Sequence, residues 1–308
     1  MDVFMENWGW IALTLFAVLM QSVRTAGQRQ LTKHVDAMGA TMVRFVFGLP
    51  FALIYLGLVM HWQGVSLPPF NQDFIVFTSI AAVLQIIATV LLVYLFSLRN
   101  FAVGITYARI EAVLTAIIGS MFFGELIGGG VWLAVIVSVA GVMMLSVARS
   151  SDVDGARLIN KLWSKSTLVG VSSGLAFAIC SLSLRRASLS FGSDDYLFTA
   201  GLVLVSTILI QCVLTVGYMA FRSAHQFPVV IKQWRLSLFV GVTSALGSIG
   251  WFIAMTLERA TYVKALGQIE FLLALAISFF FFKERTSRLE LVGMVLVAAG
   301  IVLLLVYG

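Results

Sequence analysis

Charged side chains are scarce in this sequence. Only 11% of its 308 residues are Asp, Glu, Lys or Arg, whereas a typical soluble domain has about 25%. Hydrophobic residues make up 60% of the chain, and its mean hydropathy is +1.02. This composition excludes a disordered chain and an ordinary soluble enzyme. It predicts an all-α integral membrane protein, because only helices and closed barrels can span a bilayer.

Cysteine and the signatures of catalysis are also nearly absent. The two cysteines, Cys180 and Cys212, each lie in an apolar run and neither belongs to a CxxC motif. We therefore predict neither a disulfide nor a metal site. The sequence has no HExxH motif and no Walker A loop, so we predict that the chain is not an enzyme and holds no cofactor. Any transport must then be driven by a gradient.

Long apolar runs fill most of the chain. A helix needs about 20 mainly apolar residues to cross a bilayer. Such spans leave no room for a soluble domain. Ten of them can be placed, at approximately 8–28, 38–60, 73–97, 101–123, 129–148, 167–187, 196–220, 235–257, 261–282 and 289–307.

The two halves of the chain are similar to each other. An offset of 159 places Glu111 on Glu270 and Glu125 on Glu284. The sequence therefore predicts a first five-helix repeat over 1–149, a linker over 150–166 and a second five-helix repeat over 167–308. Because five is odd, the second repeat would enter the membrane upside down, giving ten transmembrane helices as two inverted repeats, an arrangement found in many secondary transporters.

This pattern resembles the drug/metabolite transporter superfamily, in particular its EamA group. The resemblance rests on the two five-helix repeats and on the ends of the fourth helix of each half, Phe-Gly-Glu at 123–125 and Phe-Lys-Glu at 282–284. The Arg44-Phe45 pair also fits the family pattern, although the second half has no equivalent arginine. The resemblance implies a secondary transporter or exporter of small metabolites or drugs.

Two carboxylates stand out because they lie within apolar spans. Glu111 is ten residues into the fourth span and Glu270 is nine residues into the ninth. An ionisable group at the centre of a transmembrane helix costs about 2.5–3.5 kcal/mol on insertion scales. We therefore predict that both line a central cavity and bind solute or protons. The alternative is a structural role for each, with a neighbouring arginine as its partner.

Further polar and aromatic residues within or near the spans could belong to the same cavity. Arg24, Arg44 and Lys264 could each neutralise a carboxylate, and Arg24 could instead reach the membrane interface. The offset of 159 also places Arg109 on Gln268, two residues before each glutamate. The full set of predicted substrate- or proton-binding candidates is Glu111, Glu270, Arg44, Arg109, Gln268, Tyr107, Tyr94 and Trp251.

These features predict a transporter that works by alternating access and is proton-coupled at the glutamates. Its partners would be a small polar or ionic solute and the lipid bilayer, without nucleic acid, and its location would be the cell (inner) membrane. Three alternatives stay open: a lipid or polymer-precursor flippase of the same fold, an intramembrane enzyme and a non-transporting interaction subunit.

The distribution of cations makes a prediction about orientation. The net charge is +6, and 13 of the 20 cations lie in odd-numbered connections, against three in even-numbered ones. Lys and Arg gather in cytoplasmic connections, so this bias places both termini outside. Resemblance to the EamA group implies cytoplasmic termini instead.

Overall fold

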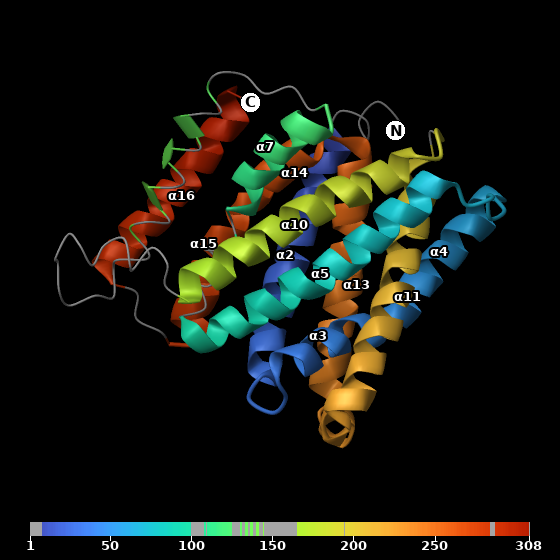
Figure 1. Ribbon diagram of the computed structural model, residues 1–308, viewed down its shortest axis with the longest axis horizontal. Coiled ribbons are helices and arrows are strands. Elements are labelled where there is room, and N and C mark those ends of the chain that lie inside the picture. The colour runs from blue at the N-terminus through green and yellow to red at the C-terminus, as the bar shows by residue number, and fades with distance from the viewer. Residues whose placement is uncertain are drawn as a thin grey trace.

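The computed structural model describes residues 8–99, 108, 110–124, 130, 133–134, 136–137, 140–141, 144, 165–193, 195–283 and 287–307, with backbone alone at 265, 268, 271, 272, 275, 301, 304 and 305. Every regular element in this part of the chain is a helix (Figure 1). The linker up to residue 164 and most of the fifth predicted span lie outside the described residues, as do Glu125 and Glu284.

Six stretches of the described chain are long and apolar enough to cross a membrane, and each matches a predicted span. The second of them contains two helices, α3 and α4. A further helix, α16, covers Arg288–Tyr307, where the tenth span was predicted. The six stretches are α2 (Trp10–Leu31), α3 with α4 (Ala37–Val46 and Leu49–Gln63), α5 (Gln72–Leu98), α10 (Lys165–Leu189), α11 (Tyr196–Arg222) and α13 (Trp234–Leu257).

Two spans differ from the single helices predicted for them. The second is interrupted between α3 and α4, where Pro50 lies in the first turn of α4. The ninth consists of α14 (Ala260–Leu266), a 3₁₀ turn (Gly267–Ile269), α15 (Glu270–Ala276) and a π-helical turn (Ile277–Phe281). In the fourth span, α7 covers Glu111–Phe122. Helix breaks in membrane proteins are tolerated where the backbone is buried in protein or lines a cavity.

The halves pack against each other in a reciprocal way. The first helix of the second half, α10, makes its most extensive contact with the third long helix of the first half, α5. In the same way, α2 of the first half packs along α13 of the second. The fourth spans follow the same rule, since α7 contacts α10 while α14 and α15 contact α2. Two equivalent repeats would produce matching pairs of helix contacts of this kind. The orientation of the two repeats relative to each other in the membrane stays a prediction.

Apolar side chains cover the outer surfaces of the helices. Leu58, Val213 and Phe280 are each more than 60% exposed, and Phe221 is 91% exposed. Soluble monomers rarely expose apolar surface on this scale, so these faces are suited to contact lipid chains. Polar groups face inward and find partners there: Ser173 Oγ, for example, donates to the backbone oxygen of Ala88 at 2.8 Å, joining α10 to α5.

Candidate functional site

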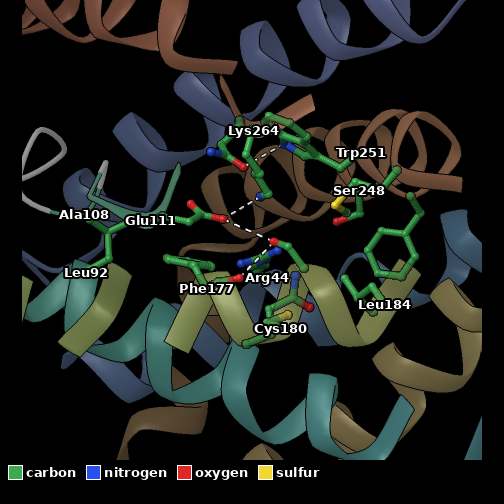
Figure 2. Close-up of a pocket in the computed structure, with 15 residues that line it drawn as sticks. Arg44, Leu92, Ala108, Glu111, Phe177, Cys180, Leu184, Ser248, Trp251 and Lys264 are labelled. Atoms are coloured by element: carbon green, nitrogen blue, oxygen red, sulfur yellow. Dashed lines mark hydrogen bonds and ion pairs between the residues drawn. The ribbon is translucent and has the colours of Figure 1, made fainter. Parts of the chain in front are cut away.

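A small cavity lies at the centre of the bundle, where both halves meet (Figure 2). Its volume is about 30 Å³, which is room for one or two water molecules. A cavity of this size is too small for a metabolite. The cavity is lined by Gln21, Arg44, Gln85, Leu92, Ala108, Glu111, Phe177, Cys180, Ser181, Leu184, Ser248, Trp251, Phe252, Met255 and Lys264.

An ion pair between the two halves crosses this cavity. Lys264 Nζ, from α14, lies 2.8 Å from Glu111 Oε1, from α7, and the two side chains are only 10% and 5% exposed. Ser181 Oγ donates to the same carboxylate oxygen at 3.2 Å. A buried pair is stable only when both charges are present, because removing one leaves the other without compensation. Of the three cations considered as partners, Arg24, Arg44 and Lys264, the structure pairs Lys264 with Glu111.

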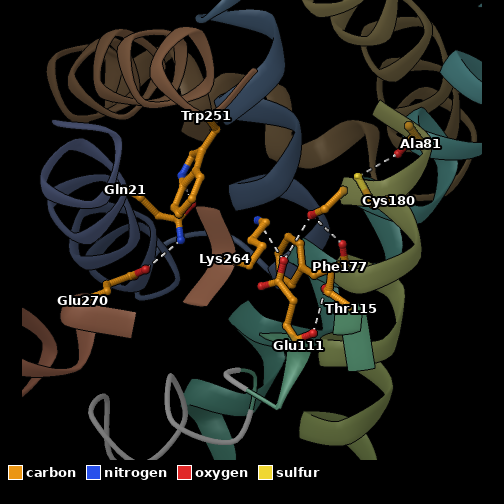
Figure 3. Close-up of polar contacts among 10 residues, drawn as sticks. Gln21, Ala81, Glu111, Thr115, Phe177, Cys180, Trp251, Lys264 and Glu270 are labelled. Atoms are coloured by element: carbon orange, nitrogen blue, oxygen red, sulfur yellow. Dashed lines mark hydrogen bonds and ion pairs between the residues drawn. The ribbon is translucent and has the colours of Figure 1, made fainter. Parts of the chain in front are cut away.

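A chain of contacts links this ion pair to the second glutamate (Figure 3). The ammonium of Lys264 lies 4.4 Å from the centroid of the Trp251 ring, within the range of a cation–π interaction. Trp251 Nε1 donates to Gln21 Oε1 at 2.9 Å, and Gln21 Nε2 donates to Glu270 Oε2 at 2.7 Å. The two equivalent carboxylates are thus connected through Lys264, Trp251 and Gln21. Glu111 lines the cavity, whereas Glu270 lies outside its lining.

Glu111 and Glu270 occupy the same local backbone position. Each is the first residue of its helix, after Ile110 with φ −56° and ψ −15° and after Ile269 with φ −56° and ψ −19°. The prediction that each lies inside a continuous helix is therefore wrong for Glu270, which follows the 3₁₀ turn. A carboxylate in the first turn of a helix is stabilised by the helix dipole.

Arg44 is buried at the cavity wall but makes a different set of contacts. Its Nε donates to Ser244 Oγ at 3.0 Å, and one terminal nitrogen donates to Thr89 Oγ1 at 2.8 Å. These bonds tie α3 to both α13 and α5. Because Thr89 belongs to the first half and Ser244 to the second, Arg44 joins both repeats near the cavity. The offset of 159 that superposes the glutamates places Thr89 on Ser248 and Gln85 on Ser244.

The remaining candidates have different positions. Trp251 lines the cavity, whereas Tyr94 is half-buried on α5 with Lys165 Nζ 5.2 Å from its ring centroid, outside the cavity lining. Arg109 and Tyr107 lie outside the described residues, and only the backbone of Gln268 is described. Arg24 is buried and donates to Thr25 Oγ1 at 3.2 Å.

Sequence reasoning missed several lining residues and left the role of Lys264 undecided. Ser181, Ser248 and Cys180 all line the cavity, and none of them was among the predicted site residues. Small hydroxyls and a lone thiol in an apolar helix give no distinctive pattern. Within the described residues, no group of three or more His, Cys, Asp or Glu is arranged to hold a metal ion.

Comparison with known proteins identifies the family. The model of the EamA-like transporter family matches the chain twice, over residues 8–147 and 161–306. The chain belongs to this family. The double match also confirms that the two halves are repeats of one unit.

Further comparisons agree on the fold. A solved structure described only as "Crystal structure of protein" is similar over 96% of each chain, with a TM-score of 0.65 and 15% sequence identity. At that identity the likeness shows the shared fold alone. No curated protein matches the chain in sequence. This member of the EamA-like family is an integral membrane protein of the drug/metabolite transporter type.

Proposed function

We propose that this chain is a secondary transporter of a small polar or ionic metabolite and that the central cavity is its solute site. The observation that carries the proposal is the buried chain of contacts that joins Glu111, which lines the cavity, to Glu270, its equivalent in the other repeat, which lies outside the lining. A soluble or purely structural bundle has no need of four ionisable side chains at such a place, and each is costly within a membrane. Three of the four, Glu111, Arg44 and Lys264, line the cavity, and the fourth, Glu270, lies beyond Gln21.

Alternating access is supported by the way in which the cavity is built. Its walls come from both halves, and the reciprocal contacts of α2 with α13 and of α10 with α5 run between the halves. Rocking of one repeat against the other would open the cavity to one side at a time. A closed state between the two openings would have a cavity too small for the solute, and the volume of about 30 Å³ is consistent with that scheme.

Proton or cation exchange is supported by the ion pair. Glu111 neutralises Lys264 while the cavity is closed. When the cavity opens to water, a proton or a cationic group of the solute competes with Lys264 for that carboxylate. Lys264 then loses its partner, and the free energy of the closed state rises until the site is vacated. The ion pair would in this way couple occupancy to conformation.

Flux into proteoliposomes tests the proposal. Purified protein is reconstituted and challenged with radiolabelled amino acids, organic cations and organic anions, with and without a pH gradient, alongside a fluorescent phospholipid. We expect saturable flux of at least one small solute, accelerated by the gradient. Movement of the phospholipid alone would show a flippase. Absence of all flux, together with turnover of a solute, would show an enzyme.

Glu270→Gln is the informative variant. Glutamine keeps an acceptor for Gln21 Nε2 and removes the titrating group. We expect the variant to insert and fold but to lose the acceleration of flux by the pH gradient. Glu258→Gln serves as the control, because Glu258 lies at the end of α13, outside the cavity lining. Unchanged pH dependence in Glu270→Gln, in Glu111→Gln and in the double variant would show that the carboxylates are structural.

A further inference from the structure

The two repeats differ at one pair of positions beside the cavity. The offset of 159 places Trp251 on Leu92 and Gly267 on Ala108. Leu92 and Ala108 belong to one buried cluster that also includes Ala274 of the second half, and both line the cavity. In the second half the larger side chain, Trp251, lies against the smaller residue, Gly267. A Cβ added to Gly267 would lie 2.5 Å from Trp251 Cη2, so the indole fits only because residue 267 is glycine.

The indole of Trp251 is held on three sides. Gln21 accepts a hydrogen bond from its nitrogen, the ammonium of Lys264 lies over its face, and Gly267 lies against its far edge. Trp251 itself is only 5% exposed. A side chain with these contacts cannot change rotamer without breaking a hydrogen bond and releasing the cation. The ring is therefore a fixed wall of the cavity (Figure 2).

We propose that Trp251 sets the size limit of the transported solute. This inference rests on the proposed function and narrows it: the solute is a compact ionic metabolite, and bulky aromatic drugs are excluded. The indole is larger than the side chain of its counterpart in the other half, Leu92. It also holds Lys264 toward Glu111, so the same residue limits volume and orients the charge that the solute meets.

The reporter for the test is a thiol already present in the cavity wall. Cys180 lines the cavity, and Cys212→Ser removes the second of the two cysteines. Two cationic methanethiosulfonates are compared in proteoliposomes, a small ethylammonium reagent and a bulky benzyltrimethylammonium reagent. Their relative rates of reaction with Cys180 measure the size limit of the path to the cavity without knowledge of the natural solute.

The decisive variant is Trp251→Leu, which installs the residue found in the first half. We expect the bulky reagent to react at least ten-fold faster than in the parent, while the rate of the small reagent changes less than three-fold. The control is Trp234→Leu, because Trp234 is exposed at the start of α13, and both rates should stay unchanged. Gly267→Ala pushes the ring toward the cavity, so it should slow both reagents.

A different pattern of reaction rates overturns the inference. If the bulky reagent reacts equally with the parent and with Trp251→Leu, or with neither, another element limits size. Folding of each variant is checked by elution as a single species in detergent, and the double variant Trp251→Leu/Gly267→Ala recreates the Leu–Ala packing if the single variant fails to fold. A positive thiol result without flux of any solute by the parent would keep Trp251 as the cavity wall but reject transport.

Discussion

Lys264 and Glu111 form an ion pair between the two repeats, with 2.8 Å between Nζ and Oε1, in a region where neither side chain is more than 10% exposed. The pair joins α14 to α7 across the central cavity. Any opening of this cavity must lengthen or hydrate that contact. Substitutions in this ion pair should therefore have different effects on the stability of the protein and on transport.

Glu111→Gln should destabilise the protein strongly, because it leaves the ammonium of Lys264 buried without a counter-charge. Removing one partner of a buried pair costs about 3–5 kcal/mol. Thermal unfolding of the purified protein in detergent measures the effect. The double variant Glu111→Gln/Lys264→Met removes both charges and should recover most of the lost stability while flux stays abolished. If the double variant is as unstable as the single one, the ion pair is not the source of the loss.

Arg44→Lys should destabilise the bundle although the charge is kept. Arg44 reaches Ser244 and Thr89 with two different nitrogens, and a lysine ammonium cannot reproduce that fork. Loss of one hydrogen bond to a charged group costs about 1.5–3 kcal/mol. The matched control is Arg222→Lys at the exposed end of α11, which should leave the unfolding midpoint unchanged. Equal midpoints for all three proteins would contradict this role of Arg44.

Two glycines should respond oppositely to alanine. A Cβ at Gly241 in α13 would lie 2.5 Å from the backbone carbon of Phe47, at the break between α3 and α4, and such overpacking costs about 1–3 kcal/mol. Gly217 in α11 has no atom within 4 Å of the added Cβ, so Gly217→Ala should raise stability by up to about 1 kcal/mol through helix propensity. Thermal unfolding compares them. A more stable Gly241→Ala variant would show that the contact between α13 and Phe47 adjusts to the added methyl group.

The positions of the long helices could be predicted from the sequence because lipid imposes a simple rule of length and polarity. Glu111 and Glu270 could be found for the same reason, since a carboxylate in an apolar run is conspicuous. Their common backbone position, at the first residue of a helix, was not predicted. The family match over both halves confirms that the internal similarity was real.

The pairing inside the cavity could not be predicted. It depends on the 3₁₀ turn at Gly267–Ile269, which sets the direction of both Lys264 and Glu270, and a single glycine is a weak signal for a helix break. The partners of Arg44 are hydroxyls, and Ser and Thr are common throughout apolar helices. Tertiary packing decides which side chains pair with one another, and the periodicity of the sequence carries no information about that packing.

The orientation of the chain in the membrane can be decided at the two ends of α11. This helix runs from Tyr196 to Arg222, and its 27 residues span roughly 40 Å at 1.5 Å per residue, so the flanking segments lie on opposite sides. Ser193 precedes it and His225 follows it, and both are exposed. The cation-rich connections include the one that holds His225, and the charge bias places them in the cytoplasm.

Single cysteines at these positions, in a Cys180→Ser/Cys212→Ser background, should therefore label differently in intact cells. We expect a membrane-impermeant maleimide to modify Ser193→Cys at once and His225→Cys only after permeabilisation. The reverse pattern would show that both termini are cytoplasmic, as resemblance to the family implies, and that the cations of the odd-numbered connections do not determine insertion. Labelling of both without permeabilisation would contradict a membrane-spanning α11, because one continuous helix of this length cannot return to the side on which it began.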